Sequence, residues 1–191
     1  DLYDLIKDIL EERDPDNKVL KEIGGEFEEY DEKDVKQLPF FMSSMKKIKT
    51  EKEVNNFIKK FNGPYLLSDK LDGSSLLFHR IIKNDKIVDK LFTRGKEGVK
   101  GRDVSQIRDL LFSKTFLDNL PKQEFTVRGE VIMTKEKFKN FSKNYAKARV
   151  ASNSVVNAKT MKKNLVNAQD YKVFQVYNPS NLSASEQYKF V

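Results

Sequence analysis

The sequence predicts an α+β domain with a mixed or antiparallel sheet and a short helical piece at the N-terminus. Stretches with helical spacing of apolar residues are interleaved with stretches of alternating or continuous apolar residues, which is typical of mixed architectures. A tight turn signal between two apolar runs, Lys83–Asp85, predicts a hairpin. With 191 residues, 38% of them hydrophobic, the chain is long enough and apolar enough for one real core.

Four stretches are predicted to be helical because their apolar residues recur every three or four positions. They are Leu2–Glu12, Glu51–Phe61, Val104–Phe112 and Lys135–Ala148. The sequences DPDN and GGEF follow the first of them and favour a linker over residues 14–37.

Five stretches are predicted to be strands because β-branched and aromatic residues gather between turn signals. They are Tyr65–Lys70, Ser74–Ile82, Ile87–Thr93, Glu124–Met133 and Tyr171–Tyr177. The first two are expected to join across Leu71–Gly73, which would place the charged Lys70 and Asp72 in a largely buried strand. Burying charges is costly unless they are paired or used, so this segment needs an explanation.

The net charge is +7, and Lys135–Lys163 is strongly basic. A polyanionic partner and a lysine-rich solvated surface explain this charge equally well. The N-terminus does not resemble a signal peptide and no apolar run approaches a membrane span, so no membrane partner is expected. The absence of cysteine excludes disulfides and cysteine-ligated zinc.

Two predicted strands each carry a cation and a carboxylate at a spacing of two, Lys70 with Asp72 and Arg128 with Glu130. Alternate residues of a strand share a face, so each pair faces one side, and Phe125, Val127, Val131 and Met133 take the other. Arg94 adds a cation beside three glycines, a composition that lets backbone approach phosphates. These residues predict a site; two structural ion pairs and a flexible loop are the alternative.

The sequence KLDG, residues 70–73, resembles motif I of the covalent nucleotidyltransferases, the superfamily of DNA ligases, RNA ligases and mRNA capping enzymes. Other segments resemble those of NAD-dependent DNA ligases, in the same order. They are PFFMSSMKKI (family "PMLSLDN"), TRGKEGVKGRDVS ("TRGDGxxGEDVT"), EFTVRGEVIM ("LEVRGEVFM"), ARVASNSVVNAK ("PRNxAAGSLRQ") and YKVFQVYNP ("LxFFAYGV"). The drift from these patterns is similar to that of large-DNA-virus ligases.

The resemblance implies the nucleotidyltransferase fold and a site. Lys70 would attack NAD and form AMP-lysine, releasing nicotinamide mononucleotide. Residues expected at the nucleotide are Ser44 and Met45 at the adenosine, Ser68 where the family has an adenine-contacting glutamate, Asp72, Arg94 and Glu130 at the ribose, phosphates or metal, Tyr177 stacked on adenine, and Tyr3 and Asp4 at the nicotinamide side. Arg149 would grip the nick phosphate of duplex DNA, while Asn157 replaces a second phosphate-binding arginine.

By the same resemblance, residues 1–36 match the tail of a nicotinamide-mononucleotide-binding domain plus a linker. Residues 37–191 match an adenylation domain that stops before the family's DGxVxK strand. The 191 residues alone are therefore expected to form little or no AMP-lysine from NAD and to seal no nicks. The protein would act as a monomer inside a cell, in the cytoplasm, the nucleoid or a viral factory, in DNA replication and repair.

The chemistry also predicts a Mg²⁺ requirement. An amine attacks only when it is neutral, whereas a free lysine has a pKa near 10.4. The anions Asp72 and Glu130 would stabilise an ammonium, so a divalent cation held by these two carboxylates is expected to offset their field.

Two alternatives remain open at this point. One is an ATP- or GTP-using RNA ligase or capping-type enzyme, which would share KxDG. The other is a non-enzymatic, basic nucleic-acid-binding domain. The nucleotide that labels the protein covalently would separate all three.

Overall fold

The computed structural model describes residues 2–21, 35–45, 47–95, 97–158 and 160–190, without the side chains of residues 2–5, 7, 8, 19 and 21. The chain divides into two compact units, Asp1–Glu32 and Lys33–Val191, and each is described by itself. No helix in these ranges is long and apolar enough to cross a membrane.

The first unit contains α1 (Leu2–Arg13) and α2 (Lys18–Lys21). The turn between them is closed by the side chain of Asn17, whose Nδ2 donates to Asp14 Oδ2 at 2.8 Å. The predicted first helix is confirmed, with its end one residue later than expected.

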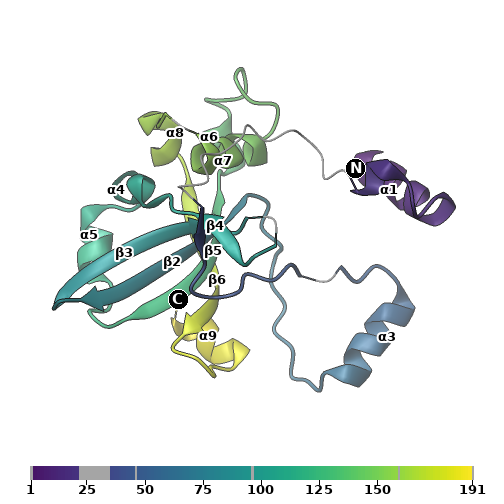
Figure 1. The fold of residues 1–191 in the computed structure, drawn as a ribbon, viewed down its shortest axis with the longest axis horizontal. Coiled ribbons are helices and arrows are strands. Elements are labelled where there is room, and N and C mark those ends of the chain that lie inside the picture. The colour runs from purple at the N-terminus through teal and green to yellow at the C-terminus, as the bar shows by residue number, and fades with distance from the viewer. Residues whose placement is uncertain (1, 22–34, 46, 96, 159, 191) are drawn as a thin grey trace. The chain divides into compact units, whose positions relative to one another are not determined.

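The second unit contains a four-stranded antiparallel sheet in the order β3-β2-β5-β6, which Figure 1 shows as a twisted layer. Its strands are β2 (Ser74–Lys83), β3 (Lys86–Thr93), β5 (Phe125–Ile132) and β6 (Asp170–Asn178). A smaller antiparallel pair joins β1 (Val35–Gln37) to β4 (Lys100–Arg102). The α+β class with antiparallel sheets is therefore confirmed.

Short helices connect and flank the strands. In chain order they are α3 (Glu51–Lys60), the 3₁₀ turn η2 (Ser105–Ile107), α4 (Arg108–Leu111), α5 (Lys114–Asn119), α6 (Lys135–Phe138), α7 (Ala148–Asn157), α8 (Lys163–Asn167) and α9 (Ala184–Phe190). In Figure 1, α6, α7 and α8 gather at one end of the sheet and α9 lies at the other.

The sheet is buried on both faces, because successive residues of β2 enter different hydrophobic clusters. Leu76 and Phe78 belong to the large cluster with α7 and α8, whereas Leu77 joins Met42 and Phe92 in a smaller one. Side chains alternate across a strand, so β2 is anchored from two sides. The four apolar residues predicted to share one face of this strand all lie in the large cluster: Phe125, Val127, Val131 and, just after β5, Met133.

Two predicted elements are wrong. Residues 65–70 form no strand and are exposed, with Leu67 97% accessible, because both edges of β2 are already paired with β3 and β5. Lys70 is thus not in a buried strand. The predicted long helix is helical only over α6 and continues as turns, in which Ser142 Oγ donates to the Lys139 carbonyl instead of supporting helix.

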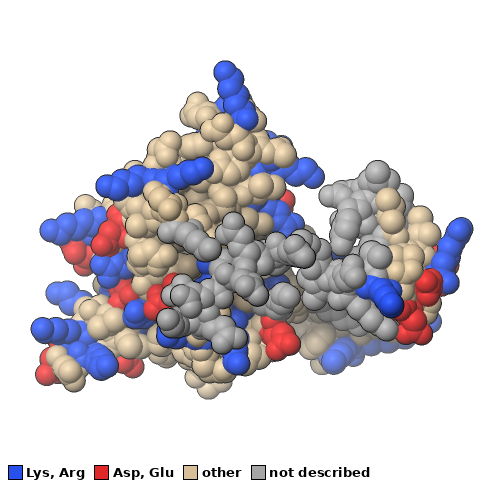
Figure 2. Space-filling view, turned by 45° about the horizontal axis from the view of Figure 1, so that its top comes forward, with Lys and Arg blue, Asp and Glu red and all other residues tan. Residues whose placement is uncertain are grey.

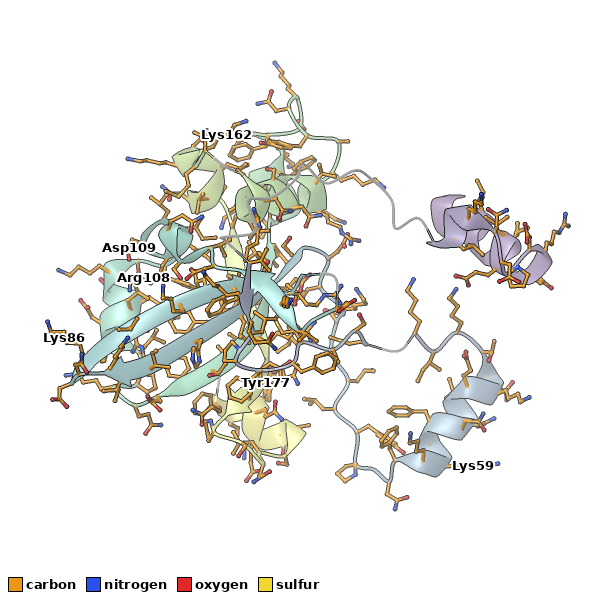
Figure 3. The ribbon with its side chains drawn as sticks, in the orientation of Figure 1. Lys59, Lys86, Arg108, Asp109, Lys162 and Tyr177 are labelled. Atoms are coloured by element: carbon orange, nitrogen blue, oxygen red, sulfur yellow. The ribbon has the colours of Figure 1, made fainter. Side chains whose placement is uncertain are left out.

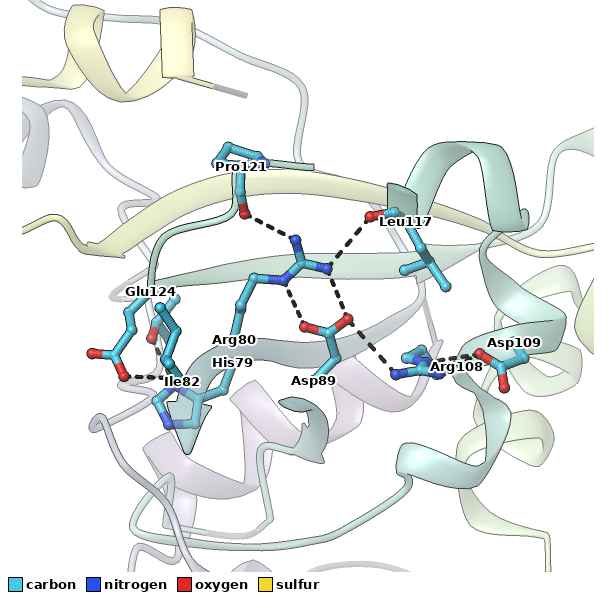
Figure 4. Close-up of polar contacts among 10 residues, drawn as sticks. His79, Arg80, Ile82, Asp89, Arg108, Asp109, Leu117, Pro121 and Glu124 are labelled. Atoms are coloured by element: carbon cyan, nitrogen blue, oxygen red, sulfur yellow. Dashed lines mark hydrogen bonds and ion pairs between the residues drawn. The ribbon is translucent and has the colours of Figure 1, made fainter. Parts of the chain in front are cut away.

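A buried ion pair joins β2 to β3, where Arg80 lies opposite Asp89 in the register (Figure 4). Arg80 Nε and Nη2 donate to the two carboxylate oxygens at 2.7 and 2.8 Å, and its Nη1 donates to the Pro121 carbonyl. The second partner of Asp89 is Arg108, 3.7 Å away. All these groups are satisfied, which makes the burial of Arg80 tolerable.

Replacing Asp89 with alanine is expected to lower the free energy of unfolding by about 3–5 kcal/mol, because it leaves the Arg80 guanidinium buried without a carboxylate. Urea denaturation of the chain measures this loss. The matched control is Asp109→Ala, which removes an ion pair whose carboxylate is 72% exposed and should cost about 0–1 kcal/mol. Equal losses for the two variants would contradict the assignment.

Candidate active site

The KLDG segment is fixed at its glycine. A Cβ on residue 73 would lie 2.0 Å from the carbonyl oxygen of Val131, so only glycine permits this approach to β5. Gly73 is buried, whereas Lys70 and Asp72 just before it are exposed. The contact therefore holds the two charged residues at the edge where β2 begins.

Glu130 lies on β5 opposite Ser75 and is the half-buried carboxylate of the site. Burial raises the pKa of Glu130, although the Gly73 backbone N–H donates to its carboxylate and the cations of Lys70, Arg128 and Arg149 favour its charged form. Lys70 is thus near enough to Glu130 for its charge to act on that carboxylate.

Arg128 is buried and ties the sheet to the segment that precedes α3. Its Nε donates to Ser75 Oγ at 3.0 Å, and its Nη1 donates to the Ser43 carbonyl at 2.8 Å. The guanidinium also lies 5.4 Å from the centre of the Phe174 ring. Arg128 therefore positions the Ser43–Met45 segment beside β5.

The loop that contains Arg94 packs on the same segment. The Met42 N–H donates to the Gly98 carbonyl at 2.9 Å, and Arg94 Nη1 donates to Ser44 Oγ at 2.8 Å. Gly98 has φ of 72°, and a Cβ there would lie 2.2 Å from the Met42 carbonyl oxygen. The predicted residues Ser44 and Arg94, fifty positions apart, are in direct contact.

Tyr177, near the end of β6 (Figure 3), is held against residues 40 and 41, just before the Ser43–Met45 segment. Its hydroxyl donates to the Phe41 carbonyl at 2.8 Å, and its ring stacks on Phe40 with centroids 5.3 Å apart. Of the other predicted nucleotide contacts, Met45 and Ser68 are exposed. The side chains of Tyr3 and Asp4 lie outside the described residues.

Helix α7 brings Arg149 to the KLDG segment. Arg149 Nη1 lies 3.2 Å from Asp72 Oδ1, and both side chains are exposed. A second tie, from Ser74 Oγ to Asn153 Oδ1, fixes α7 beside the start of β2. At the other end of α7, Arg102 Nη2 donates to Asn157 Oδ1 at 2.9 Å and to the Val156 carbonyl.

Several residues that build the site were not predicted from the sequence. Arg102 and Asn153 hold α7, which carries Arg149, and Ser43 accepts the hydrogen bond of Arg128. These contacts join distant segments, and no local pattern marks the three residues. Asn157, noted only as a missing phosphate contact, accepts the hydrogen bond of Arg102.

On the described residues of the face shown in Figure 2, basic and acidic side chains are mixed. Figure 2 shows Lys and Arg spread over much of the visible face, with Asp and Glu between them in places. A cavity of about 570 Å³ lies near the far end of β2, lined by Arg80, Arg108 and α5. It contains none of the predicted site residues.

Glu130→Gln is expected to raise the free energy of unfolding near neutral pH. Below the ordinary pKa of a glutamate the carboxyl is protonated in both states, and burial costs the wild type little. As the pH rises, the unfolded state releases its proton first, so the folded wild type loses stability. Denaturation between about pH 4 and pH 7 should show the advantage of glutamine growing with pH. An advantage that shrinks would contradict the prediction.

Comparisons with known proteins identify the family. Residues 37–176 match the family model described as the NAD-dependent DNA ligase adenylation domain. The chain is 37% identical over 182 residues to a DNA ligase of Acanthamoeba polyphaga mimivirus, covering 94% of this chain and 27% of the relative. A putative DNA ligase of Invertebrate iridescent virus 3 is 28% identical over 190 residues, covering 83% of this chain and 25% of that protein.

A putative DNA ligase of Invertebrate iridescent virus 6 is 35% identical over 124 residues, or 64% of this chain and 19% of the relative. The chain thus spans about a quarter or less of the length of these relatives. The resemblance to large-DNA-virus ligases inferred from the sequence is confirmed. The family model covers well over half of the chain, and the chain therefore belongs to the NAD-dependent DNA ligase adenylation domain family.

Proposed function

We propose that this chain is the part of a longer protein that takes AMP from NAD onto its own lysine, as the first step of sealing nicks in duplex DNA. The Lys70 nitrogen attacks the α-phosphate, a P–N bond forms, the P–O bond to nicotinamide mononucleotide breaks, and the lysine loses its proton. The observation that supports this most is the grouping of Lys70, Asp72, Arg149 and Glu130 around the buried Gly73. The fold would be that of the covalent nucleotidyltransferases.

The adenosine would lie along the Phe41–Met45 segment. Arg128 and Arg94 hold this segment through Ser43 and Ser44, so its backbone is preorganised for a ligand. Phe40 already covers one face of the Tyr177 ring, and adenine would stack on the opposite face. Arg94 would reach the ribose or phosphates, and Ser68 the base.

The carboxylates of Asp72 and Glu130 suit Mg²⁺, which commonly takes one or two protein carboxylates and completes its shell with substrate phosphates and water. The raised pKa of Glu130 also fits, because a nearby cation would stabilise its charged form. Within the described residues no three metal-ligating side chains converge, so the ion would depend on the nucleotide. When bound, it would supply positive charge beside the α-phosphate.

The nicked duplex would be held by Arg149, which α7 places beside the KLDG segment. In the full-length protein further parts would complete the DNA contact. The protein would work inside a cell or viral factory, where NAD and DNA are present together, and would act as a monomer.

Lys70→Ala in the full-length protein is expected to abolish labelling by NAD carrying radioactive AMP, while sealing of pre-adenylated nicked DNA is partly retained. Only self-adenylation needs the amine. Lys59→Ala, which changes an exposed lysine on α3, should label normally and serves as the control. Normal labelling of the Lys70 variant would remove Lys70 from the mechanism.

Nucleotide choice tests the other enzymatic candidate. The wild-type chain in its full-length context should take AMP from NAD, and not AMP from ATP or GMP from GTP. Covalent labelling from ATP or GTP instead of NAD would favour a relative of the RNA ligases or capping enzymes.

Tyr3 and Asp4 would contact the nicotinamide side, because they match the last two residues of the family's nicotinamide-mononucleotide motif. Residues 1–36 would be the tail of the domain that carries this motif, plus a linker. Tyr3→Ala or Asp4→Ala in the full-length protein should slow labelling by NAD yet spare sealing of pre-adenylated nicked DNA, since nicotinamide mononucleotide has left before sealing. Equal losses in both assays would assign these residues to folding.

A further inference from the structure

Arg149 is already engaged by an anion in the DNA-free chain. Its Nη1 lies 3.2 Å from Asp72 Oδ1, and the two side chains come from α7 and from the segment before β2. The side chains are 59% and 68% exposed, so the pair lies at the surface. A ligand approaching the KLDG segment meets this pair directly.

The pair is not what holds α7 in place. The helix is fixed near the sheet by the Ser74–Asn153 hydrogen bond and by buried Ser152, whose hydroxyl donates to Gln169 Oε1 at 2.6 Å. Its C-terminal end is tied to β4 through Arg102. An exposed ion pair is worth little in water, because both ions are well solvated when they separate. Arg149 can therefore exchange its partner without disturbing the helix.

Phosphate is a natural competitor for this position. A guanidinium binds carboxylates and phosphates through the same N–H donors. Arg149 lies in the first turn of α7, where the helix dipole also favours an anion.

We propose that Asp72 is an internal stand-in for a DNA phosphate: its carboxylate occupies Arg149 in the free domain and is displaced when the nick phosphate binds. This rests on the proposed role of Arg149 in DNA binding. One consequence is that DNA affinity is reduced by the cost of breaking the pair. The other is that DNA binding releases Asp72, which is two residues from Lys70. Binding of the nick at Arg149 and the chemistry at Lys70 are then coupled through one carboxylate.

The test is a double-mutant cycle on equilibrium binding of a nicked duplex with a 5′-phosphate, measured by fluorescence anisotropy at fixed salt. Asp72→Asn keeps the shape of the side chain and removes its charge. It should tighten binding about two- to fivefold, the range expected from freeing one exposed ion pair. In an Arg149→Ala background the same substitution should give no comparable gain.

Loss of any negative charge can strengthen DNA binding, so Asp69→Asn is the matched control: the same substitution three residues earlier, on an exposed carboxylate of the same segment. The gain in DNA affinity from Asp72→Asn must exceed the gain from Asp69→Asn. A gain that is equal with and without Arg149, or no gain, would overturn the proposal. If Arg149→Ala alone binds the duplex as tightly as wild type, Arg149 does not bind a DNA phosphate. The proposal that Asp72 occupies Arg149 in place of that phosphate then fails as well. Labelling of Lys70 by NAD in the wild type is a separate measurement, so failure of this proposal is distinguishable from failure of the proposed adenylation.

Discussion

The approach of Gly73 to the Val131 carbonyl is the constraint on which the site depends. β2 and β5 are antiparallel neighbours at the centre of the sheet, and the KLDG segment must turn onto this pair without a side chain in the way. The Gly73 N–H then reaches the Glu130 carboxylate. A methyl group at residue 73 would push the segment away and separate Lys70 from its neighbours.

The arginines of the second unit have different roles according to their burial. Arg80 and Arg128 are buried, have their donors engaged by protein oxygens, and hold segments of the fold together. Arg149 is exposed and has a partner that solvent or phosphate can replace. Burial thus separates cations that build the scaffold from one that is available to a ligand.

The glycine-rich loop and the segment before α3 form one unit for the nucleotide. The N–H groups of Leu38 and Met42 donate to loop carbonyls, those of Val99 and Gly98, and the Tyr177 hydroxyl donates to the carbonyl of Phe41. Three motifs that are far apart in the chain therefore meet on one side of the sheet. This packing accounts for Gly98, because a Cβ there would have no room beside Met42.

The sequence by itself determined the strands β2, β3, β5 and β6 and the KLDG motif, because local periodicity and turn residues such as Asn84 and Asp85 encode them. It did not determine the state of residues 65–70, because their apolar pattern fits a strand, whereas β2, the partner expected for it, is paired on both sides with β3 and β5. Nor did it pair Arg149 with Asp72 or Arg102 with Asn157. Such contacts join positions more than fifty residues apart, and only the packing of α7 on the sheet brings them within reach.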